Sequence, residues 1–183
     1  MKKSKKKNKH ILVRLLLILI VIVMTGVFMM HRLFPLSYEN EIQNSAQEFA
    51  LPFWTVVAVI KTESNFDPNA TSPQDAKGLM QLKESTADWY AQKKGLPQGD
   101  LSDPSYNIRI GCAYLSYLRQ MFGGDIYVAL AAYNAGEGNV RAWLQNPAYS
   151  ADGKTLVCIP FPETESYIKK IKLYQKIYTK LYQ

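Results

Sequence analysis

The chain has 183 residues, 48% of them hydrophobic, and a formal net charge of +7. Eight of its 22 basic residues lie within the first 32 positions, whereas all 15 acidic residues come later, beside the remaining 14 basic ones. The basicity therefore belongs to the N-terminus and gives no footprint for nucleic-acid binding. The two histidines, His10 and His31, also lie there. Their position excludes a Ser-His-Asp or Cys-His catalytic arrangement, or a His-rich zinc site, further along the chain.

The first 30 residues combine a lysine-rich leader with an apolar segment. Six lysines lie within residues 1–10, and residues 11–30 are mostly apolar apart from Arg14. Twenty residues in a helix are about 30 Å long, which matches the hydrocarbon core of a bilayer. The lysines predict that their side stays in the cytoplasm and that the rest of the chain lies outside. Arg14 can extend its charge back to the cytoplasmic surface.

We therefore predict a cytoplasmic leader at residues 1–10, a transmembrane signal anchor at 11–30, a linker at 31–37 and an extracytoplasmic domain at 38–183. The expected location is the cell membrane, crossed once. A cleaved signal peptide is the alternative, because Thr25-Gly26 offers small residues for a cut. Such a peptide would have a shorter apolar region of about 7–15 residues. The roughly 145 residues that follow the anchor are enough for one domain with its own core.

Helical patterns dominate the chain after residue 37. Apolar residues recur at helical spacing, and capping residues, Gly and Pro mark the ends. The predicted helices cover residues 38–50 with Ser37 as N-cap, 53–62, 84–94, 104–122, 126–133 with Asp125 as N-cap, 140–144 and 163–181. The β-branched residues of 53–62 would also suit a strand, but their spacing favours a helix. Asp67-Pro68 and Ser72-Pro73 predict an irregular stretch between the second and third helices.

The predicted fold class is mainly α: a bundle of short helices with at most a small β element, preceded by one N-terminal transmembrane helix. Lys169, Lys172, Lys176 and Lys180 form one face of the last helix, which we interpret as solvent-exposed; attraction to anionic polymers is the alternative. Cys112 and Cys158 lie outside the membrane in this topology, where a disulfide is permitted. Buried free thiols are the alternative, and geometry decides between the two.

Several short motifs stand in register along the domain. Glu63-Ser64-Asn65-Phe66 is followed by Gly78-Leu79-Met80-Gln81, and Ala132-Tyr133-Asn134-Ala135-Gly136 lies further on. Asn107 with Gly111 lies between them, and Glu163-Thr164 with Tyr167 completes the series. In this order and spacing the chain, from about Leu51 to Leu181, resembles the lytic transglycosylase family. Its members cut the glycan strands of peptidoglycan and share a lysozyme-like fold with goose-type lysozymes, so the resemblance implies that fold here.

Glu63 matches the catalytic glutamate of that family. Cleavage of a glycosidic bond needs an acid that keeps its proton near neutral pH, and burial beside apolar side chains raises a carboxyl pKa. Val59, Ile60 and Phe66 are candidates for such surroundings. A glutamate at a helix end that merely faces solvent is the interpretation to be excluded.

The resemblance also implies how one carboxylate suffices. Most glycosidases need a second one as base or nucleophile, and Asp67, Asp75 and Glu163 are available. In the transglycosylase family the 6-hydroxyl of N-acetylmuramic acid attacks the anomeric carbon and closes a 1,6-anhydro ring. Glu63 would then serve first as acid and later as base.

The resemblance further implies a set of substrate-binding residues: Ser72, Gly78, Met80, Gln81, Tyr133, Asn134, Glu163 and Tyr167. Gly78 would allow close backbone approach, and Gln81 would hydrogen-bond sugar groups. Structural roles are the alternatives, with Tyr133 in the core, Asn134 as a helix C-cap and Glu163 as a helix N-terminal charge. The chain departs from the family pattern at Lys77, where small residues are common, and at Glu84, where proline is usual.

The expected function is that of a membrane-anchored lytic transglycosylase, acting on peptidoglycan glycan strands without a cofactor or metal. Its partners would be those strands and the membrane, not nucleic acid, and any cell-envelope machinery it serves is open. A lysozyme-type muramidase that uses water is the first alternative, with Asp75 as the helper of that water. The second is a wall-binding module without activity, against which the retention of Glu63, Gln81 and Tyr133 argues.

Overall fold

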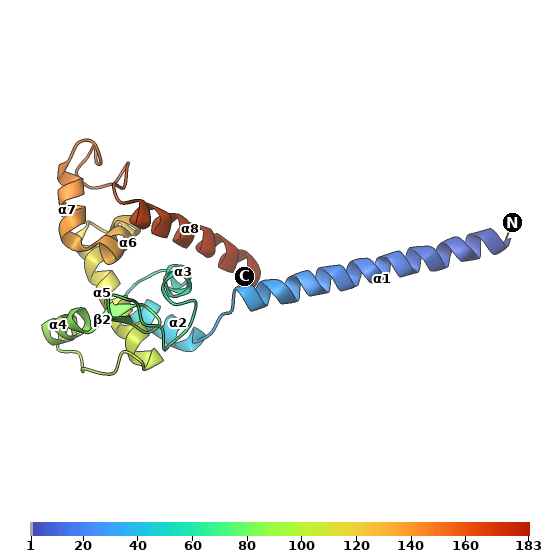
Figure 1. Cartoon of the computed structure of the whole chain (residues 1–183), viewed down its shortest axis with the longest axis horizontal. Coiled ribbons are helices and arrows are strands. Elements are labelled where there is room, and N and C mark those ends of the chain that lie inside the picture. The colour runs from blue at the N-terminus through green and yellow to red at the C-terminus, as the bar shows by residue number, and fades with distance from the viewer. Residues whose placement is uncertain (1) are drawn as a thin grey trace. The chain divides into compact units, whose positions relative to one another are not determined.

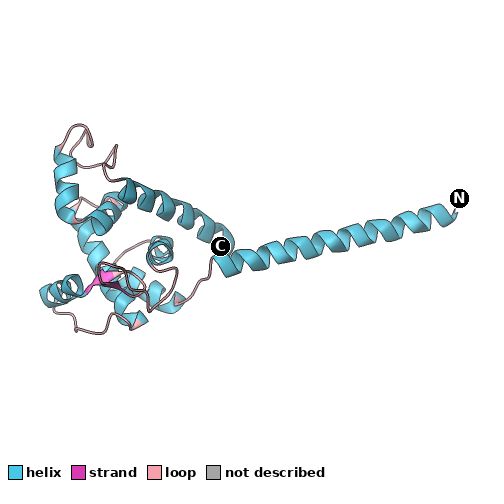
Figure 2. Ribbon diagram, in the orientation of Figure 1, coloured by secondary structure: helices cyan, strands magenta, loops and turns pink. Residues whose placement is uncertain are grey.

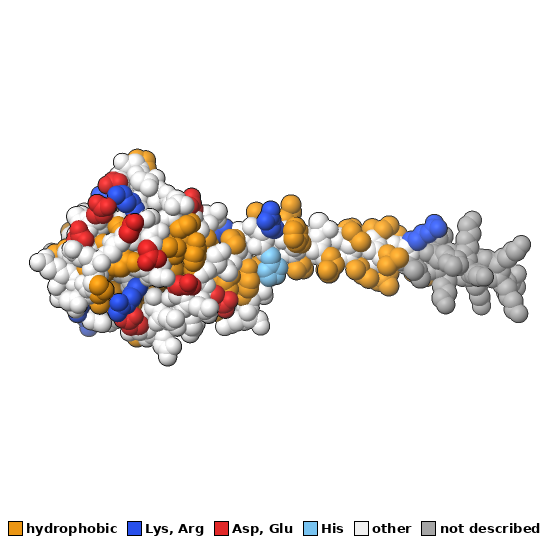
Figure 3. Space-filling view, turned by 90° about the horizontal axis from the view of Figure 1, so that it is seen from below, with side chains coloured by type: hydrophobic (Ala, Val, Ile, Leu, Met, Phe, Trp, Pro, Cys, Tyr) orange, Lys and Arg blue, Asp and Glu red, His pale blue; other side chains and the backbone are white. Residues whose placement is uncertain are grey.

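The computed structural model describes the backbone of residues 2–183 and the side chains of Leu12 and of residues 14–183. The chain divides into two compact units, one ending at Pro35 and one running from Leu36 to Gln183 (Figure 1). The first unit consists of helix α1 (Lys2–Leu33). Its segment Arg14–Leu33 is long and apolar enough to cross a membrane, and its side chains are unburied (Figure 3). A signal sequence near an N-terminus can meet the same criteria of length and composition, so the anchor stays a prediction.

The second unit is mainly helical, as predicted (Figure 2). Its elements in chain order are α2 (Glu39–Glu48), α3 (Phe53–Glu63), β1 (Ala76–Lys77), β2 (Leu82–Lys83), α4 (Glu84–Lys94), α5 (Pro104–Met121), α6 (Ile126–Ala135), α7 (Glu137–Gln145) and α8 (Pro162–Tyr182). The two strands form a single antiparallel hairpin in which Ala76 pairs with Lys83. The small β element is therefore confined to the loop that follows α3.

Helix α3 lies at the centre of the unit. It packs against α8 and α2, and every residue from Thr55 to Ile60 is buried. A helix enclosed on all sides needs apolar residues around its whole circumference, which explains why the β-branched run looked compatible with a strand. Because the run is helical, Glu63 comes to the C-terminal end of a buried helix.

The predicted helix ends are largely confirmed. Gly95 ends α4 with a left-handed φ of 64°, which glycine adopts without steric cost. The side chain of Asp103 accepts from the backbone N–H of Ser105 at the start of α5. Asp125 likewise accepts from Tyr127 and Val128 at the start of α6, so both carboxylates act as N-caps.

Three predicted ends were wrong. Ser37 does not cap α2, because Tyr38 precedes that helix in a left-handed conformation (φ 58°) and no side chain caps it. That helix also stops at Glu48, and Ala50 turns the chain with a φ of 52°. Helix α7 begins at Glu137, earlier than predicted, because Gly136 lets α6 end and α7 start at one residue.

The cysteines form no disulfide. Cys112 is buried in α5, whereas Cys158 is exposed in the loop before α8. Burial raises the pKa of the Cys112 thiol, which keeps it protonated and unreactive. The prediction of two buried thiols is thus correct for Cys112 and wrong for Cys158.

Candidate active site

A cavity of about 630 Å³ opens between the end of α3, the loop that follows it, α6 and the start of α8. Six of the nine residues predicted for the site line it: Glu63, Ser72, Gln81, Tyr133, Asn134 and Glu163. The other three, Gly78, Met80 and Tyr167, lie behind the wall and hydrogen-bond to residues that line it. The fold therefore gathers residues from distant parts of the chain around one cavity.

Two opposing effects set the pKa of Glu63 in the cavity wall. Burial raises the pKa of its carboxyl group, and a hydrogen bond from the Tyr167 hydroxyl lowers it. Burial dominates, so the pKa rises from 4.5 to about 7. The Tyr167 hydroxyl donates to Oε1 at 2.8 Å, which leaves Oε2 to carry the proton of the neutral acid. Near neutral pH, Glu63 therefore exists in both protonation states and can act as an acid and as a base.

Two buried tyrosines lie near this carboxyl group, and one of them, Tyr167, hydrogen-bonds to it. Burial and the neighbouring Glu63 raise the pKa of both Tyr167 and Tyr133 well above the ordinary value. Each hydroxyl thus stays protonated and acts as a donor. That of Tyr133 donates to the backbone carbonyl of Met80 at 2.8 Å, which connects α6 to the loop that carries Gln81.

The loop segment 77–81 is fixed to α5 by one buried side chain, Asn107. Its Oδ1 accepts from the backbone N–H of Met80 (2.8 Å), and its Nδ2 donates to the carbonyls of Lys77 and Leu101 (2.9 Å each). Gly78 has a φ of +74°, and a Cβ there would lie 2.2 Å from Nδ2 of Asn107. Only glycine fits at this position. Gly78 thus acts through the packing of the loop.

A second connection joins the loop to Ser64, the residue that follows Glu63. The hydroxyl of Ser64, at the end of α3, lies 2.8 Å from the carbonyl of Leu79 and donates to it. Met80 is fully buried and packs on Gly111 of α5, where a Cβ would lie 2.5 Å from its sulfur. The Met80 side chain therefore does not reach the cavity.

Two loop residues present polar groups to the cavity. Gln81 has a left-handed φ of 47°, and its Nε2 donates to the carbonyls of Ala70 (3.0 Å) and Gly78 (2.9 Å). These bonds orient the amide and direct Oε1 away from the loop as an acceptor. The Ser72 hydroxyl oxygen accepts from the N–H groups of Gln74 and Ala76, so its own proton remains for a ligand.

The far wall comes from α6 and α8. The Thr164 hydroxyl donates to Oδ1 of Asn134 at 2.7 Å, which leaves the amide NH₂ of Asn134 as the donor for a ligand. Glu163, in the first turn of α8, is exposed at the edge of the cavity. Thr164 is fully buried and positions Asn134, a role that the sequence did not reveal.

The two departures from the family pattern form a pair. Lys77 in β1 and Glu84 at the start of α4 form an ion pair at 2.8 Å across the hairpin. Both side chains are partly exposed, so the pair adds little stability.

Asp75 does not line the cavity. Its side chain is 73% exposed and lies 3.8 Å from Lys77 in an ion pair. Among the cavity-lining residues only Glu63 and Glu163 carry carboxylates. Within the described part of the chain, no three His, Cys, Asp or Glu side chains gather in a way that would hold a metal ion.

Sequence reasoning missed part of the cavity wall. Gln74, Lys83, Thr86 and Tyr114 also line it. Tyr114 follows Gly111 by about one helical turn, and that spacing was the available signal. Gln74, Lys83 and Thr86 have no such signal, because the hairpin and the packing of α4 bring them to the cavity.

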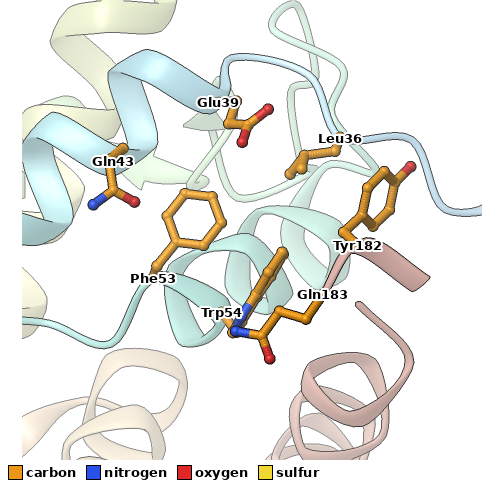
Figure 4. A pocket seen from close by; sticks show the side chains of 7 residues that line it. All are labelled: Leu36, Glu39, Gln43, Phe53, Trp54, Tyr182 and Gln183. Carbon is orange, nitrogen blue, oxygen red and sulfur yellow. The ribbon is translucent and has the colours of Figure 1, made fainter. Parts of the chain in front are cut away.

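Two other cavities lack a buried acid. One of about 420 Å³ lies at the other end of α3, where Phe53, Trp54 and Tyr182 surround it and its only carboxylate, Glu39, is exposed (Figure 4). Another, of about 830 Å³, adjoins Asp125 and Asp152. Hydrogen bonds from Thr155 and Lys154 hold the pKa of Asp152 at about 2, so it cannot donate a proton near neutral pH.

Comparison with known proteins identifies the fold and its family. The family model of the transglycosylase SLT domain matches residues 40–156, and the chain belongs to this family. It is 38% identical over 150 residues to the soluble lytic murein transglycosylase of Escherichia coli, which covers 79% of this chain and 23% of that protein. It is 31% identical over 177 residues to the membrane-bound lytic murein transglycosylase C of Yersinia enterocolitica, covering 81% of this chain and 47% of that protein.

Solved structures agree. The lytic transglycosylase Slt of Pseudomonas aeruginosa, solved as an inactive glutamate-to-glutamine mutant, matches with a TM-score of 0.71 and 34% identity over 81% of this chain and 25% of that one. Slt70 of Escherichia coli matches with a TM-score of 0.73 and 33% identity over 82% and 25%; it is also known in complex with bulgecin A. The predicted lysozyme-like fold and family resemblance are thereby confirmed. The chain spans about a quarter of the length of these soluble relatives.

Proposed function

We propose that this chain is a membrane-anchored lytic transglycosylase that cleaves the β-1,4 bond between N-acetylmuramic acid and N-acetylglucosamine and leaves 1,6-anhydro ends. The observation that carries the proposal is Glu63, a carboxyl group with a pKa of about 7 in the wall of a 630 Å³ cavity. Relatives named as lytic transglycosylases support the substrate class. The inactive glutamate-to-glutamine mutant of the Pseudomonas relative fits a mechanism that depends on one acid.

In the first step, neutral Glu63 donates its proton from Oε2 to the bridging glycosidic oxygen. The bond from that oxygen to the muramyl anomeric carbon breaks, and the N-acetylglucosamine end leaves with a new hydroxyl group. The carboxylate formed accepts the hydrogen bond of Tyr167, which stabilises its charge. Glu63 and Tyr167 thus share the task of holding the charge until the second step.

In the second step, the Glu63 carboxylate takes the proton of the muramyl 6-hydroxyl, whose oxygen bonds to the anomeric carbon. The ring closes, Glu63 is neutral again, and no water is consumed. Because the nucleophile belongs to the bound sugar, no second carboxylate is needed, and proximity lowers the barrier by as much as about 7–11 kcal/mol. The exposed, ion-paired position of Asp75 gives a hydrolytic route no support.

The remaining site residues either contact the sugar or position the groups that do. Ser72, Gln81 and Asn134 offer a hydroxyl proton, an amide oxygen and an amide NH₂ to sugar groups, and Glu163 borders the entrance. Tyr133, Gly78 and Met80 keep the loop in position, and Tyr167 orients the acid. Anchoring by α1 with the domain outside is supported by the apolar helix and by the relative named as membrane-bound.

Product analysis tests the proposal. The purified full chain in detergent is incubated with glycan strands, and the ends of the products are weighed by mass spectrometry. We expect 1,6-anhydro ends, which are lighter than hydrolysed ends by one water. Glu63→Gln keeps the shape of the side chain but cannot donate the proton, so its rate should fall by about 10²–10⁴-fold. Free reducing ends alone would make the protein a hydrolase, and full activity of Glu63→Gln would refute the mechanism.

A further inference from the structure

A row of aromatic side chains leads from the cavity to the surface of the second unit. Tyr133 and Tyr114 line the cavity, with ring centroids 5.7 Å apart. Tyr114 stacks on Tyr117 at 6.3 Å and 25°, and Tyr117 meets Trp89 edge-on at 5.7 Å. Trp89 is 45% exposed. We call these four residues the aromatic row.

The outer end of the row lies one step beyond the cavity on two helices at once. On α4, Trp89 follows the cavity-lining Thr86 by three residues, and on α5, Tyr117 follows the cavity-lining Tyr114 by three residues. Three residues of helix advance about 4.5 Å. Because both residues lie the same distance further along their helices, Trp89 and Tyr117 continue the same wall outward.

The outer end also carries an unneutralised positive charge. The ammonium group of Lys93 lies 4.6 Å from the ring centroid of Trp89 and 4.2 Å from that of Tyr117, and it donates to the Tyr117 hydroxyl at 3.1 Å. These contacts restrict both rings. Among the ion pairs of the described side chains, none includes Lys93.

An exposed indole beside a cavity is a surface that still has apolar area to bury. The apolar face of a sugar ring fits such an indole, and the row connects it without a break to the proposed catalytic cavity. The stem peptides of peptidoglycan carry carboxylates, which complement the free charge of Lys93. A glycan strand therefore offers both an apolar ring face for Trp89 and a carboxylate for Lys93.

We propose that Trp89, Tyr117 and Lys93 form an outer subsite for the glycan strand. In it, a further sugar of the strand packs on Trp89, and a carboxylate of its stem peptide faces Lys93. This inference rests on the proposed function, because it takes the strand in the cavity as the occupant that continues outward. The subsite makes binding depend on the length of the strand.

Binding to the catalytically inactive Glu63→Gln chain tests the subsite. Peptidoglycan fragments of increasing length are titrated onto the full chain in detergent by calorimetry. We expect affinity to rise once a fragment is long enough to leave the cavity along the row. Trp89→Ala in this background should weaken the binding of long fragments by about 10-fold and remove the dependence on length. Trp89→Phe, which keeps a ring, should retain most of the affinity.

A matched control comes from an exposed tyrosine outside the cavity. Tyr127 of α6 is also exposed and has Lys172 4.2 Å above its ring, but it does not line the cavity. Tyr127→Ala removes a similar cation–π pair and should leave length-dependent binding unchanged. Lys93→Met keeps an apolar chain without the charge. It should lower affinity only for fragments with stem peptides, and added salt should remove that difference.

The outcomes separate this inference from the proposed function. Cleavage of strands by the unmodified chain, together with equal binding of long fragments by the Trp89→Ala and Tyr127→Ala variants, would overturn the subsite and leave the function intact. Absence of cleavage would overturn the function, while the length-dependent loss of binding in Trp89→Ala would still support a glycan site. In an active background, Trp89→Ala should raise KM for long strands and leave kcat unchanged.

Discussion

Glu63 carries the chemistry of the proposed mechanism because two features of its surroundings shift its pKa in opposite directions. Burial favours the neutral acid, and the Tyr167 hydroxyl favours the carboxylate. A carboxyl group with either effect alone would be committed to one state. The balance near pH 7 suits a group that must first give a proton and then take one back.

The same balance makes a prediction about stability. Well below pH 4.5, Glu63 is neutral in both the folded and the unfolded chain, so its ionisation does not change the free energy of unfolding. As pH rises from 4.5 to about 7, the unfolded chain ionises first, which favours unfolding. The resulting loss in the free energy of unfolding approaches about 3 kcal/mol near pH 7 and stays at that value at higher pH. Glu63→Gln removes it, so the mutant should gain in Tm over the unmodified chain as pH rises across this window.

Tyr167→Phe provides the comparison for that measurement. It removes the hydrogen bond that lowers the pKa of Glu63, so the pKa should move upward. The Tm difference from Glu63→Gln should therefore level off at a higher pH for Tyr167→Phe than for the unmodified chain. Thermal unfolding of the three proteins between pH 4 and 8, followed by circular dichroism, measures both effects. A Tm difference that does not change with pH would show that Glu63 is not buried as described.

At the scale of elements, the loop 77–81 is held from several sides. Asn107 of α5 binds its backbone, Ser64 at the C-cap of α3 binds Leu79, and Tyr133 of α6 binds Met80. The loop has little regular structure of its own, so these bonds define its conformation. Gln81 takes its strained backbone conformation within this framework.

Gly111→Ala tests how closely the loop is packed. The new Cβ would lie 2.5 Å from the sulfur and 2.9 Å from the Cβ of Met80. The tip of Met80 can move, but its Cβ can move only with the backbone. We expect a loss of about 1–3 kcal/mol in the free energy of unfolding and a lower kcat/KM, because Gln81 moves with the loop.

The same substitution elsewhere should act in the opposite direction. Gly138 is exposed in α7, and a Cβ there would meet no atom within 4 Å. Gly138→Ala should stabilise the chain by about 0.5 kcal/mol through the lower entropy of the unfolded state. Chemical denaturation of both mutants measures the contrast. Equal effects of the two substitutions would mean that Met80 does not pack on Gly111.

At the scale of the whole molecule, the chain joins an apolar helix to a domain that carries 14 basic and 15 acidic residues. The leader holds six lysines and no acidic residue, and the domain holds the cavity with Glu63. In the proposed topology, the anchor would limit the domain to strands within its reach.

Protease protection measures that topology. Added to intact, wall-stripped cells, protease should degrade the domain from Leu36 onward and spare the lysine leader, because the proposed topology places the leader in the cytoplasm. Permeabilised cells serve as the control, in which the leader is cut as well. A mature protein that starts near residue 28 and is found in the medium would show that the apolar segment is a signal peptide.

Much of this protein was determined by local sequence. Helical spacing, Gly95, Asp103 and Asp125 predicted the helices and their ends, because these signals act within a few residues. The order of the motifs around Glu63, Gln81 and Tyr133 was enough to indicate the family. Errors arose where local signals compete. Ser37 would make a good cap, but Tyr38, in a left-handed conformation, takes the position directly before α2.

The tertiary structure alone decided the rest, because it depends on contacts between distant residues. Burial raised the pKa of Glu63, and the Tyr167 hydroxyl that contacts it lies 104 residues away in the chain. The pairing of Lys77 with Glu84 and the place of Asp75 outside the cavity followed from the hairpin. The aromatic row arose from the register of α4 and α5. A sequence indicates which residues are present for chemistry, but desolvation and distance, which set their pKa and partners, exist only in the folded chain.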